Sequence, residues 1–249
     1  MRAGGAGTKV FAGVGFVVTL FAWGQMGAQA SALDMQAEAV KPAHVVFSFE
    51  RAGMPVPKFT LDVDQNGRGR YSGEEAMPVV RGVATEPATQ AFERSFAIPG
   101  GSAEKIFRLA RQADRFNVEC ASKAKNIADT GSKMLRYEGA DGAGSCAFNY
   151  TENKAVGEIT DLLLGMAETM DEGRELDRLH RYDRLGLDEA MATLSVEVGE
   201  GHALELETIA GTLRSLVGDA EVMQRVRARA TALLRLIPAG AIAPDGAVR

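Results

Sequence analysis

Residues 59–72 read FTLDVDQNGRGRYS, and they indicate the fold class of the N-terminal half. Apolar Phe59, Leu61 and Val63 alternate with polar residues, which is the period of a strand with one buried face. Asn66-Gly67 behind them is the strongest short signal for a β-hairpin, because a type I′ turn needs a positive φ at both central residues. The stretch therefore predicts antiparallel strands joined by a tight turn.

The same period of two recurs outside this hairpin. It predicts further strands over 45–50 and 90–98 and a second hairpin over 132–151. Residues 73–88, which include Pro78 and Pro87, favour a loop. Apolar residues at helical spacing predict one amphipathic helix over 103–116. Residues 41–152 are therefore expected to form an antiparallel sheet with one helix.

The hydrophobic period changes to 3.6 residues after residue 153, and strand signals end. Apolar stripes predict helices over 156–170, 206–217 and 222–237, with shorter helices over 174–184 and 188–199. We therefore predict an α+β fold, in which N-terminal antiparallel β-hairpins and one helix precede an all-helical region over 153–238. Residues 239–249 hold Gly, Pro and Ala and are expected to form a flexible tail.

The first 30 residues have the layout of a secretory signal peptide. Positively charged residues precede an apolar run over 10–26, and Ala28-Gln29-Ala30 places small residues at the two positions that a signal peptidase recognises. Cleavage there would start the mature chain at Ser31, with residues 31–40 as a lead segment. An uncleaved anchor is the alternative. We expect an exported protein, periplasmic or extracellular, with no membrane span after signal cleavage.

Cys120 and Cys146 are the only cysteines, and both lie beyond the predicted signal peptide. In an oxidising compartment such a pair is most simply a disulfide, and two buried free thiols are the alternative. Closing the loop between them would stabilise the fold by about 3.5 kcal/mol in the chain-entropy model. Their spacing is not C-x-x-C, so a thioredoxin-like redox function has no support.

The balance of charge argues against a nucleic-acid-binding protein. The chain carries 28 Lys and Arg against 33 Asp and Glu. Removing residues 1–30 takes away Arg2 and Lys9 and no acid, which leaves 26 against 33, a formal charge of −7. Nucleic-acid-binding domains are normally basic. We therefore expect the partner to be a protein or a small molecule.

Asp62, Asp64 and Asn66 match the opening D-x-D-x-N-G of an EF-hand calcium loop. Such a loop ends in a bidentate Glu at position twelve, whereas position twelve here is Gly73. The hairpin interpretation explains the same residues without a metal, and we prefer it to the calcium candidate. The sequence predicts no cofactor.

No catalytic motif stands out. G-x-S-x-G, H-E-x-x-H and C-x-x-C are absent, and no two of His44, His180 and His202 lie three or four residues apart. The charged run over 172–184 is interpreted as a solvated helix face with mixed ion pairs, and a recognition surface is the alternative. We predict an exported, non-enzymatic binding or interaction module. The competing hypothesis is an exported hydrolase whose site assembles only in three dimensions.

Overall fold

The alternating stretches form a six-stranded antiparallel sheet in the computed structural model, which describes residues 41–77 and 88–238. All of these residues belong to one unit of the chain, 40–249. The predicted signal peptide, lead segment and C-terminal tail lie outside the described residues. The described part holds six strands and five α-helices, and four of these helices lie in the C-terminal half. This arrangement confirms the α+β fold.

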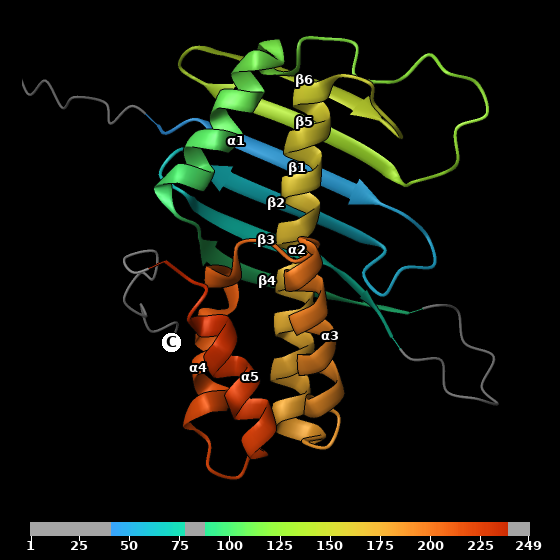
Figure 1. Cartoon of the computed structure of the whole chain (residues 1–249). Helices are drawn as coiled ribbons and strands as arrows, with labels where there is room; N and C mark the ends of the chain where they lie inside the picture. The colour runs from blue at the N-terminus through green and yellow to red at the C-terminus, as the bar shows by residue number, and fades with distance from the viewer. Residues whose placement is uncertain (1–40, 78–87, 239–249) are drawn as a thin grey trace, which may run out of the picture. The chain divides into compact units, whose positions relative to one another are not determined.

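Each strand of the sheet is antiparallel to its neighbours. The strands are β1 His44–Glu50, β2 Lys58–Asp64, β3 Arg68–Ala76, β4 Thr89–Ala97, β5 Ser132–Gly139 and β6 Gly142–Phe148. Across the sheet their order is β4-β3-β2-β1-β5-β6. β1 joins the two predicted hairpins by pairing with β5, which places Phe47 opposite Leu135. β4 and β6 are therefore the two edge strands (Figure 1).

The hairpin between β2 and β3 is confirmed, but the predicted type I′ turn is wrong. Gly67 has a positive φ of 78°, whereas Asn66 does not. The Gly67 N–H donates to the Asp64 carbonyl at 3.0 Å, which gives a type I turn followed by a left-handed glycine. β3 also continues to Ala76, so the first residues of the predicted loop over 73–88 belong to the strand.

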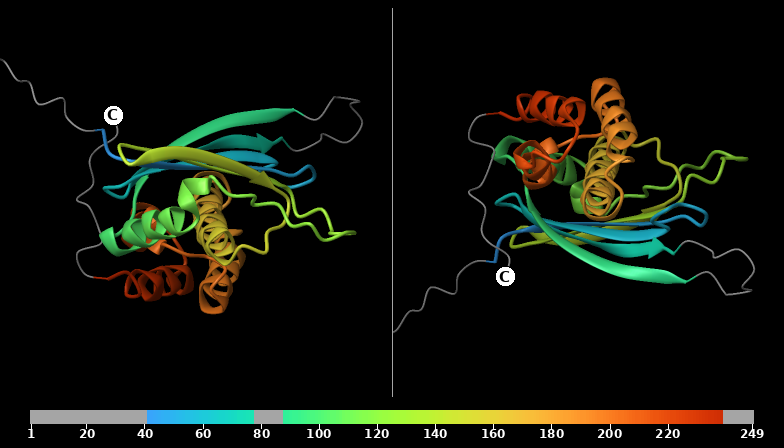
Figure 2. Two further views of the ribbon diagram at one scale, coloured as in Figure 1. Left: turned by 90° about the horizontal axis from the view of Figure 1, so that it is seen from above. Right: turned by 90° about the horizontal axis from the view of Figure 1, so that it is seen from below.

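One face of the sheet is apolar and carries the helices. Phe47, Leu61 and Tyr137 lie on this face and are fully buried. Their sequence neighbours point to the opposite face, as the period of two predicts. Figure 2 shows the helices of the described residues gathered on one side of the sheet.

Five α-helices accompany the sheet. They are α1 Gly100–Gln112, α2 Lys154–Tyr182, α3 Leu187–Glu200, α4 Ala210–Gly218 and α5 Gln224–Leu234, with short 3-10 helices η1 Asp114–Phe116 and η2 Leu206–Ile209. Asn153 caps α2, because its side chain accepts hydrogen bonds from the N–H groups of Ala155 and Val156. In the described part of the chain, no helix has both the length and the hydropathy of a membrane span.

α2 is one continuous helix, so the separate helix predicted over 174–184 is wrong. The apolar stripe over 156–170 continues with Leu176 and Leu179, which are also buried. Figure 1 shows α2 crossing the strands and continuing past β4, where α3, α4 and α5 lie beside it. Packing along both parts of the helix outweighs the polar stretch between them.

Two hydrophobic clusters meet along α2. The first combines the sheet and α1 with the part of α2 between Val156 and Met170. The second combines α2 from Leu176 onward with α3, α4 and α5. The first cluster therefore draws on residues from both predicted regions, 41–152 and 153–238.

Cys120 and Cys146 form the predicted disulfide, with their Cα atoms 5.8 Å apart. The bond joins β6 to the segment that follows η1. A disulfide is typical of a protein from an oxidising compartment.

Candidate functional site

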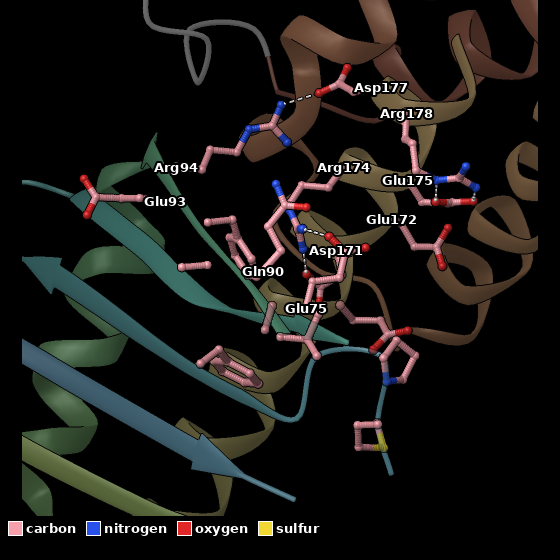
Figure 3. Close-up of a pocket in the computed structure, with 18 of the residues that line it drawn as sticks. Glu75, Gln90, Glu93, Arg94, Asp171, Glu172, Arg174, Glu175, Asp177 and Arg178 are labelled. Carbon is pink, nitrogen blue, oxygen red and sulfur yellow. Dashed lines mark hydrogen bonds and ion pairs between the residues drawn. The ribbon is translucent and has the colours of Figure 1, made fainter. Parts of the chain in front are cut away.

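A groove with a volume of about 1280 Å³ lies between the β4 edge of the sheet and α2. Five consecutive residues of β4, Gln90–Arg94, line it together with Glu75 of β3 and the loop 54–56. α2 supplies the opposite wall through side chains between Leu164 and Tyr182. Figure 3 shows charged side chains of α2 facing those of β3 and β4.

The floor of the groove is apolar because it is the end of the buried sheet face. Phe49 and Phe59 lie in this floor with ring centroids 5.2 Å apart, and Phe92 adds a third ring from β4. Leu164 of α2 is half-buried, and Met54 in the loop is 38% exposed. Apolar side chains that line an open groove are typical of a ligand-binding site.

Arg174 fixes α2 to the edge of the sheet. Its guanidinium donates to Asp171 at 3.1 Å and to Glu75 of β3. The same guanidinium lies 3.5 Å from the ring centroid of Phe92, a cation–π contact. Because only 19% of the Arg174 side chain is exposed, these interactions hold the groove wall in one geometry.

Arg94 makes the second link between the two walls. It lies on the helix-facing side of β4, and its Nη2 donates to Asp177 of α2 at 2.5 Å and to Thr212 of α4 at 3.4 Å. Its Nη1 is buried and donates no hydrogen bond to any of the described residues. This ion pair marks one end of the groove along β4.

Buried Tyr71 and half-buried Asp171 lie behind these ion pairs. The Tyr71 hydroxyl donates to Asp171 Oδ1 at 2.9 Å. Burial raises the pKa of Tyr71, and the nearby Asp171 raises it further. Burial also raises the pKa of Asp171 to about 6, although Tyr71 and Arg174 oppose the shift. The hydrogen bond positions the carboxylate that holds Arg174.

Three carboxylates gather where α2 meets α3. Oxygens of Glu168, Glu172 and Glu197 all lie within 4.8 Å of one another. Burial and, after it, the neighbouring acids Glu197 and Glu168 together raise the pKa of Glu172 to about 7. One oxygen of Glu197 is buried and accepts no hydrogen bond from the described residues. Such a group is chemically suited to a cation, either a hard metal ion or an ammonium group.

Replacing Glu172 with glutamine should stabilise the protein at pH 8 and change little at pH 5. Because the pKa is raised in the folded protein, the free energy of unfolding falls as the pH rises from about 4.5 to about 7. Above pH 7 this loss of stability is complete and stays constant. Glutamine removes this cost, which is about 1 kcal/mol once solvent screening of a half-buried group is allowed for. Denaturant unfolding at both pH values measures it.

Glu104→Gln is the matched control for this change. Glu104 is exposed on α1, so its replacement should alter the free energy of unfolding by less than about 0.5 kcal/mol at either pH. An effect of Glu172→Gln that is equal at pH 5 and pH 8 would contradict the electrostatic explanation.

The calcium candidates lie on the β2–β3 hairpin and not in the groove. Asp64 Oδ1 accepts hydrogen bonds from the N–H groups of Asn66 and Arg68, at 2.8 and 2.9 Å. Asp62 Oδ1 lies 2.8 Å from His44 Nδ1. Both carboxylates thus have a structural use in the hairpin, and calcium binding there is an untested alternative.

The three histidines each lie beside a carboxylate. His44 pairs with Asp62, His180 with Asp219 at 2.8 Å, and His202 lies 3.5 Å from a glutamate of α3. Within residues 41–77 and 88–238, no serine, threonine or cysteine side chain is hydrogen-bonded to a histidine ring.

The charged run over 172–184 is only in part a solvated face. Arg178 pairs with Glu175 one turn away, as the solvated-face interpretation predicts. Arg174 and Asp177 instead face the sheet, which this interpretation missed. Their partners lie 99 and 83 residues away in sequence, so no local pattern could identify the groove.

The comparisons with known proteins do not assign the chain to a family. No family model matches it, and no curated protein matches it significantly. The groove is therefore the feature from which a function can be inferred.

Proposed function

We propose that this protein is an exported, non-enzymatic binding module whose ligand occupies the groove between β4 and α2. The observation that carries the proposal is an open apolar floor bordered by charged side chains that are already held in place. Arg94 and Arg174 keep their positions through ion pairs with Asp177 and Asp171. A site fixed before the ligand arrives loses less free energy on ordering its side chains.

Export is the second part of the proposal. The signal-peptide pattern of residues 1–30 supports it, and the Cys120–Cys146 disulfide fits an oxidising compartment. The periplasm and the extracellular space both suit these features. The competing hydrolase hypothesis has His–Asp pairs in its favour, but it lacks a paired nucleophile among the described residues, so we place it second.

A ligand screen by NMR tests the groove. The probes are aromatic amines and acetylated tripeptides that contain Phe and Lys, added to the isotope-labelled protein. We expect amide shift changes to cluster on residues 90–94 and 164–182. Leu164→Arg should weaken these probes at least tenfold, because it places a large charged group on the apolar floor.

Leu185→Arg is the matched control, since Leu185 is 82% exposed and does not line the groove. It should leave the affinity within about twofold. Shift changes that cluster elsewhere, or equal affinity in the two variants, would remove the groove as the binding site. Turnover of ester or phosphate substrates that is lost on His180→Ala would favour the hydrolase instead.

A further inference from the structure

The main chain of β4 faces the groove with unpaired hydrogen-bonding groups. Two main-chain hydrogen bonds, one at each end of the β3–β4 pair, show which residues of β4 bond to β3. Met77 N–H donates to the Ala88 carbonyl, and Ile98 N–H donates to the Gly67 carbonyl, both at 2.8 Å. In an antiparallel pair, residues bonded to the neighbouring strand alternate with residues that are not. The even-numbered residues of β4 therefore bond to β3, and the odd-numbered ones direct their N–H and C=O groups away from it.

Ala91 and Glu93 are the outward-facing residues that line the groove. In the described part of the chain, no hydrogen bond reaches the main chain of either residue. Both residues are exposed, so the free main-chain groups are accessible. An edge strand of this kind is a template for pairing with another extended chain.

We propose that a basic, extended segment of a partner polypeptide binds in the groove by adding a strand to the open edge of β4 along Gln90–Arg94. This inference rests on the proposed function and names its ligand class. Five residues of strand span about 17 Å. Strand addition supplies main-chain hydrogen bonds, while side chains on one face of the segment enter the groove and decide specificity.

The charge of the groove favours a basic segment. Seven acids and four arginines line it. Three of the arginines, Arg94, Arg174 and Arg178, are already paired with acids of β3 or α2. Among the described residues, no cationic partner is found for Glu168 or Glu172. A lysine or arginine of the segment would face this excess of negative charge.

The same charge disfavours a second copy of this chain as the occupant. Pairing two β4 edges would bring Glu93 and the other acids of one copy beside those of the next, and like charges placed together oppose association. The floor of the groove around Phe92 is apolar, so we also expect an apolar residue in the segment. An apolar residue two positions from a basic one lies on the same face of the segment and can reach this floor.

Fluorescence anisotropy with two labelled peptides tests the inference. One peptide is Ac-Lys-Thr-Val-Thr-Lys-Thr-Val-NH2, in which lysine and valine share one face of a strand, and the other carries glutamate at every lysine position. We expect the lysine peptide to bind at least tenfold more tightly. Combined Glu168→Gln and Glu172→Gln should weaken it about tenfold, whereas Glu104→Gln should leave the affinity unchanged.

A pair of proline variants tests the strand addition itself. Ala91→Pro removes an outward N–H from the open edge, a position where an edge strand tolerates proline. Ala147→Pro is its matched control on β6. The Gly139–Gly142 pair closes a two-residue turn, so by the same alternation Ala147 also faces outward on an exposed edge. Ala91→Pro should weaken the lysine peptide at least tenfold, and Ala147→Pro should not.

Amide exchange gives a readout that does not depend on a variant. When the lysine peptide saturates the protein, exchange of the Ala91 and Glu93 amides should slow at least tenfold. The Gln90 and Phe92 amides, already bonded to β3, should change little. If the peptide shifts groove resonances but Ala91→Pro binds normally and these amides gain no protection, strand addition is wrong and the binding groove stands.

Three other results would also overturn the inference. Equal affinity for the lysine and glutamate peptides would remove the basic preference. Light scattering that shows a dimer broken by Ala91→Pro would make a second copy the occupant. If neither peptide nor any of the NMR probes perturbs the groove, the inference and the proposed function fail together.

Discussion

Replacing Cys120 and Cys146 together with serine should lower the free energy of unfolding by about 3.5 kcal/mol. The bond ties β6 to the segment after η1 across a sequence separation of 26 residues. Without it, the unfolded chain regains the freedom of that loop, while the folded chain keeps its other contacts. Urea denaturation of the oxidised protein and the serine variant measures the difference, which is a large fraction of the stability of an ordinary domain.

The reduced form of the unaltered protein is the control. Its stability should match that of the double-serine variant within about 0.5 kcal/mol, because both lack only the cross-link. Intact mass after treatment with an alkylating reagent reports the bond directly, and the same spectrum shows whether the chain begins at Ser31. A loss below about 1 kcal/mol would mean that other contacts already order the loop in the unfolded chain.

Gly165→Ala should destabilise the protein by about 2 kcal/mol, although alanine is the better helix former. Gly165 lies inside α2 where the segment 202–204 crosses it. A Cβ there would sit 2.7 Å from the His202 carbonyl oxygen and 2.8 Å from Leu204. The Leu204 N–H also donates to the Gly165 carbonyl at 3.1 Å, so the crossing segment cannot move away without losing that bond.

Gly157→Ala in the same helix should have the opposite sign. Its Cβ would meet nothing closer than a methyl carbon of Thr151 at 4.0 Å. We expect it to stabilise the protein by up to about 1 kcal/mol, the ordinary gain from glycine to alanine inside a helix. Thermal unfolding of the two variants side by side separates the contact from the propensity. Two shifts of the same sign would show that the crossing does not constrain α2.

Local periods in the sequence predicted most of the sheet and little of the groove. The alternation of Phe59, Leu61 and Val63 is a property of neighbouring residues, and it located the buried face correctly. The turn type depends on the φ of Asn66, which the Asn-Gly pair alone does not determine. The pairing of β1 with β5 joins residues about ninety positions apart, so no short window contains it.

Lys133 shows a second limit of pattern reasoning. It occupies a buried position on the apolar face of β5, where the period of two predicts a hydrophobic residue. Its Nζ donates to the carbonyls of Thr130, Gly131 and Asn149, at 2.9, 3.0 and 2.9 Å. A charged group is tolerated in the core because the turn of the chain around it supplies acceptors. Only the folded backbone reveals those acceptors.

The sharing of α2 between two hydrophobic clusters limits how this protein can be divided. A chain truncated after β6 would keep all its strands and yet lose the part of α2 that belongs to the same hydrophobic cluster as Phe47. The helical region expressed alone would in turn expose Val156 and Met170 to water. Domain swaps, fusions and circular permutations therefore have to carry α2 intact, and the two regions are expected to be inherited as one unit.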